Sequence, residues 1–171
     1  YSTPAIGRNK YAKENFSKDN LWNEIDFKGG DLNTSIIKTS LGRTIMVQWD
    51  ETSPRPYTRL NLIQGTKGIL AGGPTRAAFD NGFENYSNDA EKWITGKGIE
   101  QLYEKFDHPL YKRLNSKTKY SGHGGMDGIM MYRIVECLQN GLPLDQNVYE
   151  GSAWSSLIEL TSKSVNNDGH P

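Results

Sequence analysis

"TSIIKTSLGRTIMVQWDE", residues 34–51, is the stretch that decides the fold class. Two runs rich in β-branched residues, 34–40 and 43–51, are joined through a Leu-Gly dipeptide, and this pattern predicts a β-hairpin. Side chains alternate between the two faces of a strand. One face of the second predicted strand therefore carries Ile45, Val47 and Trp49, and the other carries Thr44, Met46, Gln48 and Asp50.

The hairpin pattern continues downstream. "GTKG" at 65–68 separates the apolar runs "TRLNLIQ" (58–64) and "ILAGG", which is the signal of a tight turn between two strands. We therefore expect at least four strands between residues 34 and 72, mostly antiparallel. Residues 73–97 combine Gly, Pro, Asn and Asp with scattered aromatics, and we expect an irregular surface segment there with room for short strands.

Helical patterns dominate the second half of the chain. The first two predicted helices cover residues 98–106 and 107–115, the second with Asp107 as N-cap and Pro109 in its first turn. A third helix begins at Met126 and stops at Gly141. The last helix begins with a capping box of Asn147 and Glu150. Strands first and helices later predict an α+β fold, with an open, mostly antiparallel sheet and helices on one face. We expect residues 1–171 to form a single domain.

Composition excludes several classes of protein. The 171 residues include 35% hydrophobic and 11% aromatic residues, enough for a folded core, and the formal net charge is zero. Neither a basic cluster nor a run of about 18 apolar residues is present, so we expect no nucleic-acid partner and no membrane span. Cys137, the single cysteine, excludes an internal disulfide framework and is most simply a small buried hydrophobe. A chain that begins at Tyr1 without a signal-like segment is expected to be a mature or excised part of a protein.

"TKYSGHGGMDGIMMYR", residues 118–133, is glycine-rich and has three interpretations. A phosphate-binding loop would need a preceding buried strand, which the polar residues 115–121 do not provide, and Asp127 would repel a phosphate. A metal site would need more ligands than His123 and Asp127. The remaining interpretation is a glycine-rich helix start, in which Gly128 indicates close packing. His123 would then face a cleft, either as a structural residue or as a ligand contact.

"TSPRPYTR", residues 52–59, is the second candidate binding segment. Its two prolines predict a stiff, extended bend that fixes Arg55 and Tyr57. Such a Tyr ring can stack on a sugar face while its hydroxyl donates a hydrogen bond, and Arg55 can bind a polar substrate. From chemistry alone the simpler interpretation is that Tyr57 packs and that Arg55 pairs with Asp50 or Glu51. We find no Ser/His/Asp or Cys/His arrangement and assign no catalytic residue in this chain.

Three long stretches together resemble a known family. "GDLNTSIIKTSLGRTIMVQWDETSPRPYTRLNLIQGTKG", "GHGGMDGIMMYR" and "CLQNGLPLDQNVYEGSAWSSLIELTSKSV" resemble the C-terminal part of glycoside hydrolase family 109. This is an α-N-acetylgalactosaminidase family within the Gfo/Idh/MocA group of NAD(P)-dependent sugar proteins. The resemblance covers residues 8–72 and 98–166, and residues 73–97 have no counterpart that we can place.

The resemblance implies a two-domain bacterial protein. Its N-terminal Rossmann domain would bind NAD, and a Tyr-Pro-x-His segment with catalytic groups would precede Tyr1. This chain would be most of the C-terminal domain, which covers the active site and contributes to a homo-oligomer. The implied mechanism is oxidation at C3 of the sugar by bound NAD⁺, elimination of the glycosidic oxygen, addition of water and return of the hydride. We therefore predict that the isolated chain is inactive and binds neither cofactor nor metal. Export to the periplasm is a further implication.

The resemblance also assigns site residues. Tyr57 matches the active-site Tyr of the family's Ser-Pro-Arg-Pro-Tyr motif, so the resemblance favours Tyr57 as a carbohydrate contact, with Arg55 beside it in the motif and His123 facing the same cleft. Trp49 departs from the family pattern, which has His at this position; this leaves activity open, and the ring offers a sugar platform instead. A sugar oxidoreductase of the same group and a non-catalytic sugar-binding or association module are the alternative functions.

Overall fold

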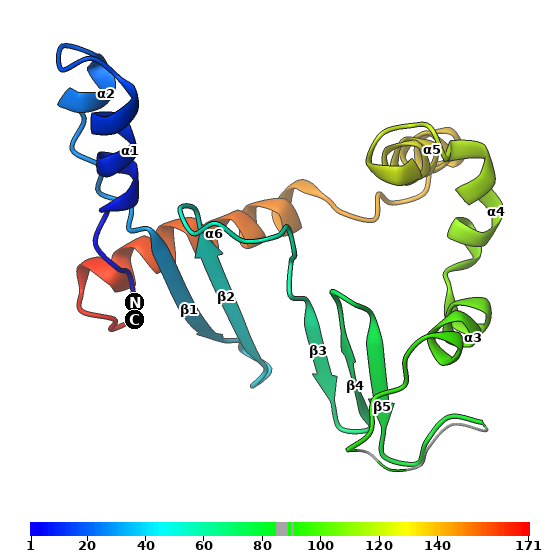
Figure 1. Cartoon of the computed structure of the whole chain (residues 1–171). Helices are drawn as coiled ribbons and strands as arrows, with labels where there is room; N and C mark the ends of the chain where they lie inside the picture. Colours follow the sequence, from blue (N-terminus) through cyan, green and yellow to red (C-terminus); the bar gives the residue numbers. More distant parts are fainter. Residues whose placement is uncertain (85–88, 90) are drawn as a thin grey trace. The chain divides into compact units, whose positions relative to one another are not determined.

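The computed structural model describes residues 1–84, 89 and 91–171, which form two compact units (Figure 1). The first unit contains residues Tyr1–Arg55 and Gln146–Pro171, and the second contains Pro56–Asp145. The elements of the first unit are α1 (Gly7–Asn15), α2 (Leu21–Glu24), β1 (Leu32–Lys38), β2 (Thr44–Asp50) and α6 (Val148–Asn166). Those of the second are β3 (Leu62–Gly65), β4 (Gly68–Ala71), β5 (Arg76–Phe79), α3 (Lys97–Phe106), α4 (Pro109–Thr118), the 3₁₀ turn η1 (His123–Gly125) and α5 (Met126–Asn140).

The hairpin predicted for residues 34–51 is present as β1 and β2. The antiparallel register runs from Leu32 opposite Asp50 to Lys38 opposite Thr44. Thr39 leaves the strand because its hydroxyl accepts a hydrogen bond from the backbone N–H of Arg43 at 3.0 Å, which turns the chain. The strands are therefore shifted by one or two residues from the predicted runs, because turn chemistry decides where a β-branched run stops.

The second predicted hairpin is confirmed, and a further strand extends it. β3 and β4 pair antiparallel across the two-residue turn 66–67, and β4 also pairs with β5, so the order is β3–β4–β5. β5 lies in the segment expected to be irregular, part of which is outside the described residues. Its Ala77 forms a β-bridge with Ile94, and both pack with Ile99 and Leu102 of α3 in a small apolar core.

The helix boundaries confirm three predicted signals and correct one. Gly141 ends α5 in the left-handed conformation, Asn147 and Glu150 form a complete capping box at α6, and Pro109 is at the first turn of α4. Asp107 is not the N-cap of α4, because only two residues separate α3 from α4 and Asp107 ends α3. The Nδ1 atom of His108 accepts the Leu110 N–H at 3.1 Å and caps α4 instead.

The α+β class and the antiparallel pairing are confirmed. The described strands are grouped as two small sheets, one in each unit, where the sequence indicated one. The single-domain assignment stays a prediction. Among the helices that the structure describes, none combines the length and hydropathy needed to span a membrane.

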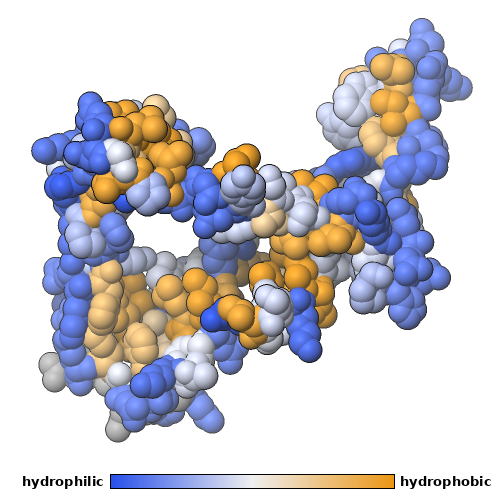
Figure 2. Space-filling model, turned by 180° about the vertical axis from the view of Figure 1, so that it is seen from behind, coloured by the Kyte–Doolittle hydropathy of each residue, from blue (hydrophilic) through white to orange (hydrophobic). Residues whose placement is uncertain are grey.

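Much apolar surface remains uncovered. Hydrophobic residues occupy a large part of the face shown in Figure 2, and no residue of α6 is buried. Two large apolar side chains of this helix, Trp154 and Ile158, are 71% and 77% exposed. Cys137, by contrast, is fully buried on α5, as predicted.

Candidate functional site

Tyr57 lies in the extended segment between β2 and β3, and its side chain projects into solvent. The residue is 85% exposed, so it does not pack against its own unit. Its hydroxyl oxygen accepts a hydrogen bond from Nε of Arg59 at 2.8 Å. The phenolic proton therefore remains available for donation to a ligand. An exposed ring with a fixed oxygen suits sugar contact, and the role of Tyr57 as a binding residue stays a prediction.

Arg55 forms the pair with Asp50 that the simpler interpretation predicted. Its Nε lies 3.8 Å from Oδ2 of Asp50, which is an ion pair without a close hydrogen bond. The backbone N–H groups of Ser53 and Thr52 also donate to this carboxylate. The Ser53 N–H is the main cause that lowers the pKa of Asp50, and Arg55 contributes less. Arg55 therefore belongs to a local turn in the first unit, whereas Tyr57 belongs to the second.

Trp49 lies on β2 and is 61% exposed. Its ring N–H donates to Oε1 of Glu51 at 2.5 Å, and the other oxygen of Glu51 is ion-paired with Arg8 of α1. One edge of the indole is thus fixed by hydrogen bonding. The predicted use of this ring as a sugar platform is compatible with its exposure.

His123 is placed by the glycine-rich stretch in front of α5. Gly124 and Gly125 have φ values of 69° and 102°, a backbone region that favours glycine, and His123 itself has φ 46°. Nδ1 of His123 lies 2.9 Å from Oδ2 of Asp127, in the first turn of α5. The side chain of His123 is 72% exposed, so Nε2 is free to meet a ligand. The unusual glycine dihedrals agree with the helix-start interpretation.

Two observations concern the other interpretations of this stretch, the phosphate-binding loop and the metal site. The segment follows α4, not a strand, and the Asp127 carboxylate stands at the N-terminus of α5 where a phosphate would bind. Across residues 1–84, 89 and 91–171, no group of three or more His, Cys, Asp or Glu side chains is arranged to hold a metal ion.

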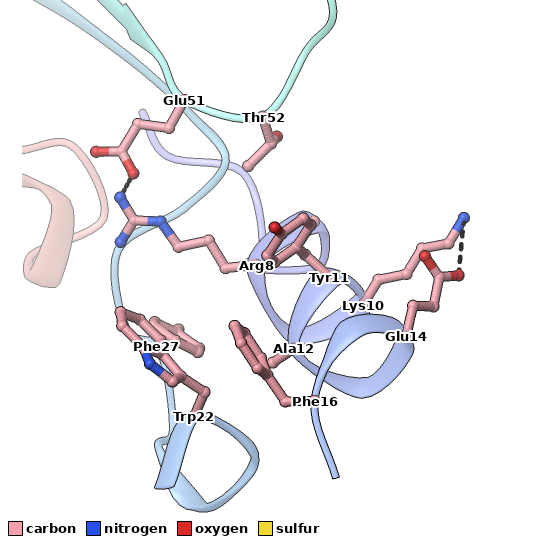
Figure 3. Close-up of a pocket in the computed structure, with 11 residues that line it drawn as sticks. Arg8, Lys10, Tyr11, Ala12, Glu14, Phe16, Trp22, Phe27, Glu51 and Thr52 are labelled. Carbon is pink, nitrogen blue, oxygen red and sulfur yellow. Dashed lines mark ion pairs between the residues drawn. The ribbon is translucent and has the colours of Figure 1, made fainter. Parts of the chain in front are cut away.

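Two features of the structure were not predicted from the sequence. Arg133 of α5 donates to both oxygens of Asp145 and to Glu136, which also pairs with Arg113. These contacts with Arg133 lower the pKa of both carboxyls. The second feature is a pocket of about 840 Å³ beside α1 and α2 (Figure 3). Its only signal in the sequence is the density of aromatic residues between 11 and 27.

Each of the two α+β units exposes an aromatic ring beside a hydrogen-bonded polar group, Trp49 in the first and Tyr57 in the second, and such rings suit polar ring-shaped ligands such as sugars. The sequence profile described as "Glycosyl hydrolase 109, C-terminal domain" matches residues 1–171. The chain is 58% identical over 174 residues to "Glycosyl hydrolase family 109 protein 1" of Akkermansia muciniphila, covering 100% of the chain. It is 48% identical over 167 residues to "Alpha-N-acetylgalactosaminidase" of Shewanella oneidensis, covering 97% of the chain. The chain therefore belongs to glycosyl hydrolase family 109, as its sequence motifs predicted.

The matches cover only part of each relative. The chain spans 35% of the length of the Akkermansia protein and 36% of that of the Shewanella protein. The family assignment thus applies to this chain, which is about a third of the length of these relatives.

Proposed function

We propose that this chain is the substrate-side, C-terminal domain of a bacterial NAD-dependent glycosidase that releases α-linked N-acetylgalactosamine. The observation that carries the proposal is the 48% identity, over 97% of the chain, to a protein named for that activity. Exposed aromatic rings with fixed polar edges support a role in sugar binding.

The chain would contribute substrate contacts. Tyr57 would place its ring against a sugar face and donate its hydroxyl proton, because Arg59 already donates to the hydroxyl oxygen. The Asp127 carboxylate would hold the proton of neutral His123 on Nδ1, which leaves Nε2 as an acceptor for a sugar hydroxyl. Trp49 would act as a stacking platform, and Arg55 would stabilise the bend before Tyr57 through Asp50.

The described residues do not fit NAD. A dinucleotide site needs a strand followed by a glycine-rich turn and a helix N-terminus, but residues 119–125 follow a helix and a carboxylate stands at the start of α5. We therefore propose that an N-terminal Rossmann domain of the parent protein binds NAD. The oxidation–elimination–addition–reduction sequence stays a hypothesis about the parent protein.

Product analysis tests the proposal. The full-length protein is incubated with an aryl α-N-acetylgalactosaminide and NAD⁺, and both aryl alcohol and NADH are measured. Release of the aryl alcohol without net NADH supports the glycosidase. Net NADH formation from free sugar would instead support a sugar oxidoreductase. Saturable sugar binding by the isolated chain, with no turnover by the full-length protein, would support a non-catalytic module.

We further propose that the parent protein is exported to the periplasm and is a homo-oligomer. These proposals rest on the family and, for the oligomer, on the exposed apolar side chains of α6. Cell fractionation with an antibody to this chain tests the first, and recovery in the cytoplasmic fraction would contradict it.

A further inference from the structure

The pocket lies in the first unit, and none of the residues that line it has a role in the proposed reaction. It has a volume of about 840 Å³, within the range of about 300–1,000 Å³ that small-molecule sites occupy. In Figure 3 its walls come from α1, α2, the segment after α2 and the residues that follow β2. The side chains that matter here are Arg8, Tyr11, Phe16, Trp22, Phe27 and Glu51.

Aromatic rings form much of the pocket wall. Phe16 and Phe27 each stack on Trp22, with ring centroids 6.3 Å and 6.0 Å apart and interplanar angles of 18° and 16°. Tyr11 meets Phe16 edge-on at 6.1 Å. Trp22 nevertheless stays 51% exposed. Mutual stacking therefore fixes the rings while leaving apolar surface open to a ligand, at little cost in side-chain entropy.

Charged groups in the pocket balance one another. The guanidinium of Arg8 lies 5.9 Å from the centre of the Phe27 ring and is ion-paired with Glu51. Lys10 and Glu14 pair at 3.8 Å on another side of the pocket. Two cations and two carboxylates leave no net charge, so the pocket does not attract an anion or a cation. The cations of these ion pairs can still donate hydrogen bonds and the carboxylates can still accept them. Since a hydroxyl group can do both, the pocket favours a neutral polyhydroxylated ligand.

We propose that this pocket is a binding site for a neutral pyranose sugar, as a monosaccharide or as one unit of an oligosaccharide. The C–H face of the sugar would lie against the part of the Trp22 ring that stacking leaves exposed, and its hydroxyls would bond to the N–H groups of Arg8 and the oxygens of Glu51. Glu51 also accepts the ring N–H of Trp49, so the pocket adjoins a predicted sugar platform. The proposal does not depend on the hydrolytic reaction.

Fluorine NMR of the full-length protein labelled with fluorotryptophan tests the site directly. A Trp22→Phe variant assigns the Trp22 resonance. Lactose and N-acetylgalactosamine are the neutral probes, and glucuronate is the anionic probe. The proposal predicts a saturable shift of the Trp22 resonance with a neutral probe and a much weaker response to glucuronate. An unshifted Trp22 resonance, as expected if another part of the protein fills the pocket, would overturn it, as would an equal response to glucuronate.

Affinity measurements on variants add a second readout. Trp22→Ala is expected to weaken binding, seen by calorimetry, at least about tenfold, because the stacking surface is lost. Trp93→Ala is the matched control: Trp93 is also partly exposed, at 43%, and lies under the guanidinium of Arg76, but outside the pocket. Glu51→Gln keeps the side-chain shape and is also expected to weaken binding. It is the test variant if Trp22→Ala fails to fold. Unchanged affinity in Trp22→Ala, or in Glu51→Gln where it replaces that variant, refutes the site. Neither the NMR shift nor the calorimetric affinity depends on glycosidase activity. Failure of this proposal can therefore be distinguished from failure of the proposed function.

Discussion

Replacement of Gly128 by Ala tests how closely α5 packs against the end of α4. A Cβ atom at Gly128 would lie 2.2 Å from Oγ of Ser121 and 2.9 Å from both Cβ and Cγ2 of Thr118. The two neighbours are fixed, because the Ser121 hydroxyl donates to the Thr118 carbonyl at 2.6 Å and the Thr118 hydroxyl donates to the Leu114 carbonyl at 3.1 Å. A methyl group therefore forces at least one of these hydrogen bonds to break.

The magnitude follows from three opposing effects. Overpacking costs roughly 1–3 kcal/mol, and a lost hydrogen bond costs about 1 kcal/mol more. Removing a glycine from a helix interior gains up to about 1 kcal/mol. We therefore expect Gly128→Ala to lower the local free energy of unfolding by about 1–3 kcal/mol.

Hydrogen exchange with mass spectrometry on peptides from residues 109–140 of the full-length protein measures this loss. Gly151→Ala in α6 is the matched control, because the nearest atom to its new methyl group would be Nε2 of Gln146 at 3.9 Å. It is expected to stabilise α6 by up to about 1 kcal/mol. If Gly128→Ala stabilises its helix as Gly151→Ala does, the packing argument is refuted.

Three further predictions concern the ion pairs of Arg133, the exposed apolar face of α6 and the binding of NAD. Arg133 lowers the pKa of Glu136 and of Asp145 in the folded protein. The pairs of these carboxylates with Arg133 therefore stabilise the fold at a pH above the ordinary carboxyl pKa, and this stabilisation is lost as the pH falls through the lowered pKa values. Thermal unfolding midpoints should thus fall more steeply on acidification in the wild type than in Arg133→Gln, and equal slopes would contradict this. The isolated chain should self-associate in light scattering through Trp154 and Ile158, and a strictly monomeric chain would count against it. It should also show no saturable NAD binding by calorimetry, and measurable affinity would refute the cofactor assignment.

Elements fixed by neighbouring residues could be predicted from the sequence. The β1–β2 hairpin, the 66–67 turn and the cap at Gly141 each depend on residue types within a few positions. β5 was not predicted as a defined strand, because "RAAF" has no alternating pattern and Ala77 pairs with Ile94, 17 positions away in sequence (94 − 77). Such pairing depends on tertiary contacts that a local pattern does not contain.

The candidate site also combines features that nearby residues determine with features that depend on tertiary contacts. The sequence pointed to Tyr57, Trp49 and His123, and the polar partners of all three lie within four positions, as an extended strand or a helix turn dictates. The pair of Arg8 with Glu51 joins residues 43 positions apart (51 − 8), so the aromatic pocket could not be predicted. Asp107 was misassigned as a cap because the close succession of α3 and α4 was not recognised.

The role of Tyr57 is tested most directly by the turnover of a Tyr57→Phe variant of the full-length protein on an aryl α-N-acetylgalactosaminide. Loss of a hydroxyl that donates a hydrogen bond to the sugar should lower kcat/KM by about tenfold, with an unchanged unfolding midpoint. Tyr120→Phe is the matched control, because Tyr120 is 92% exposed in the same unit and has no assigned role. A Tyr57→Phe enzyme as active as Tyr120→Phe would contradict the account.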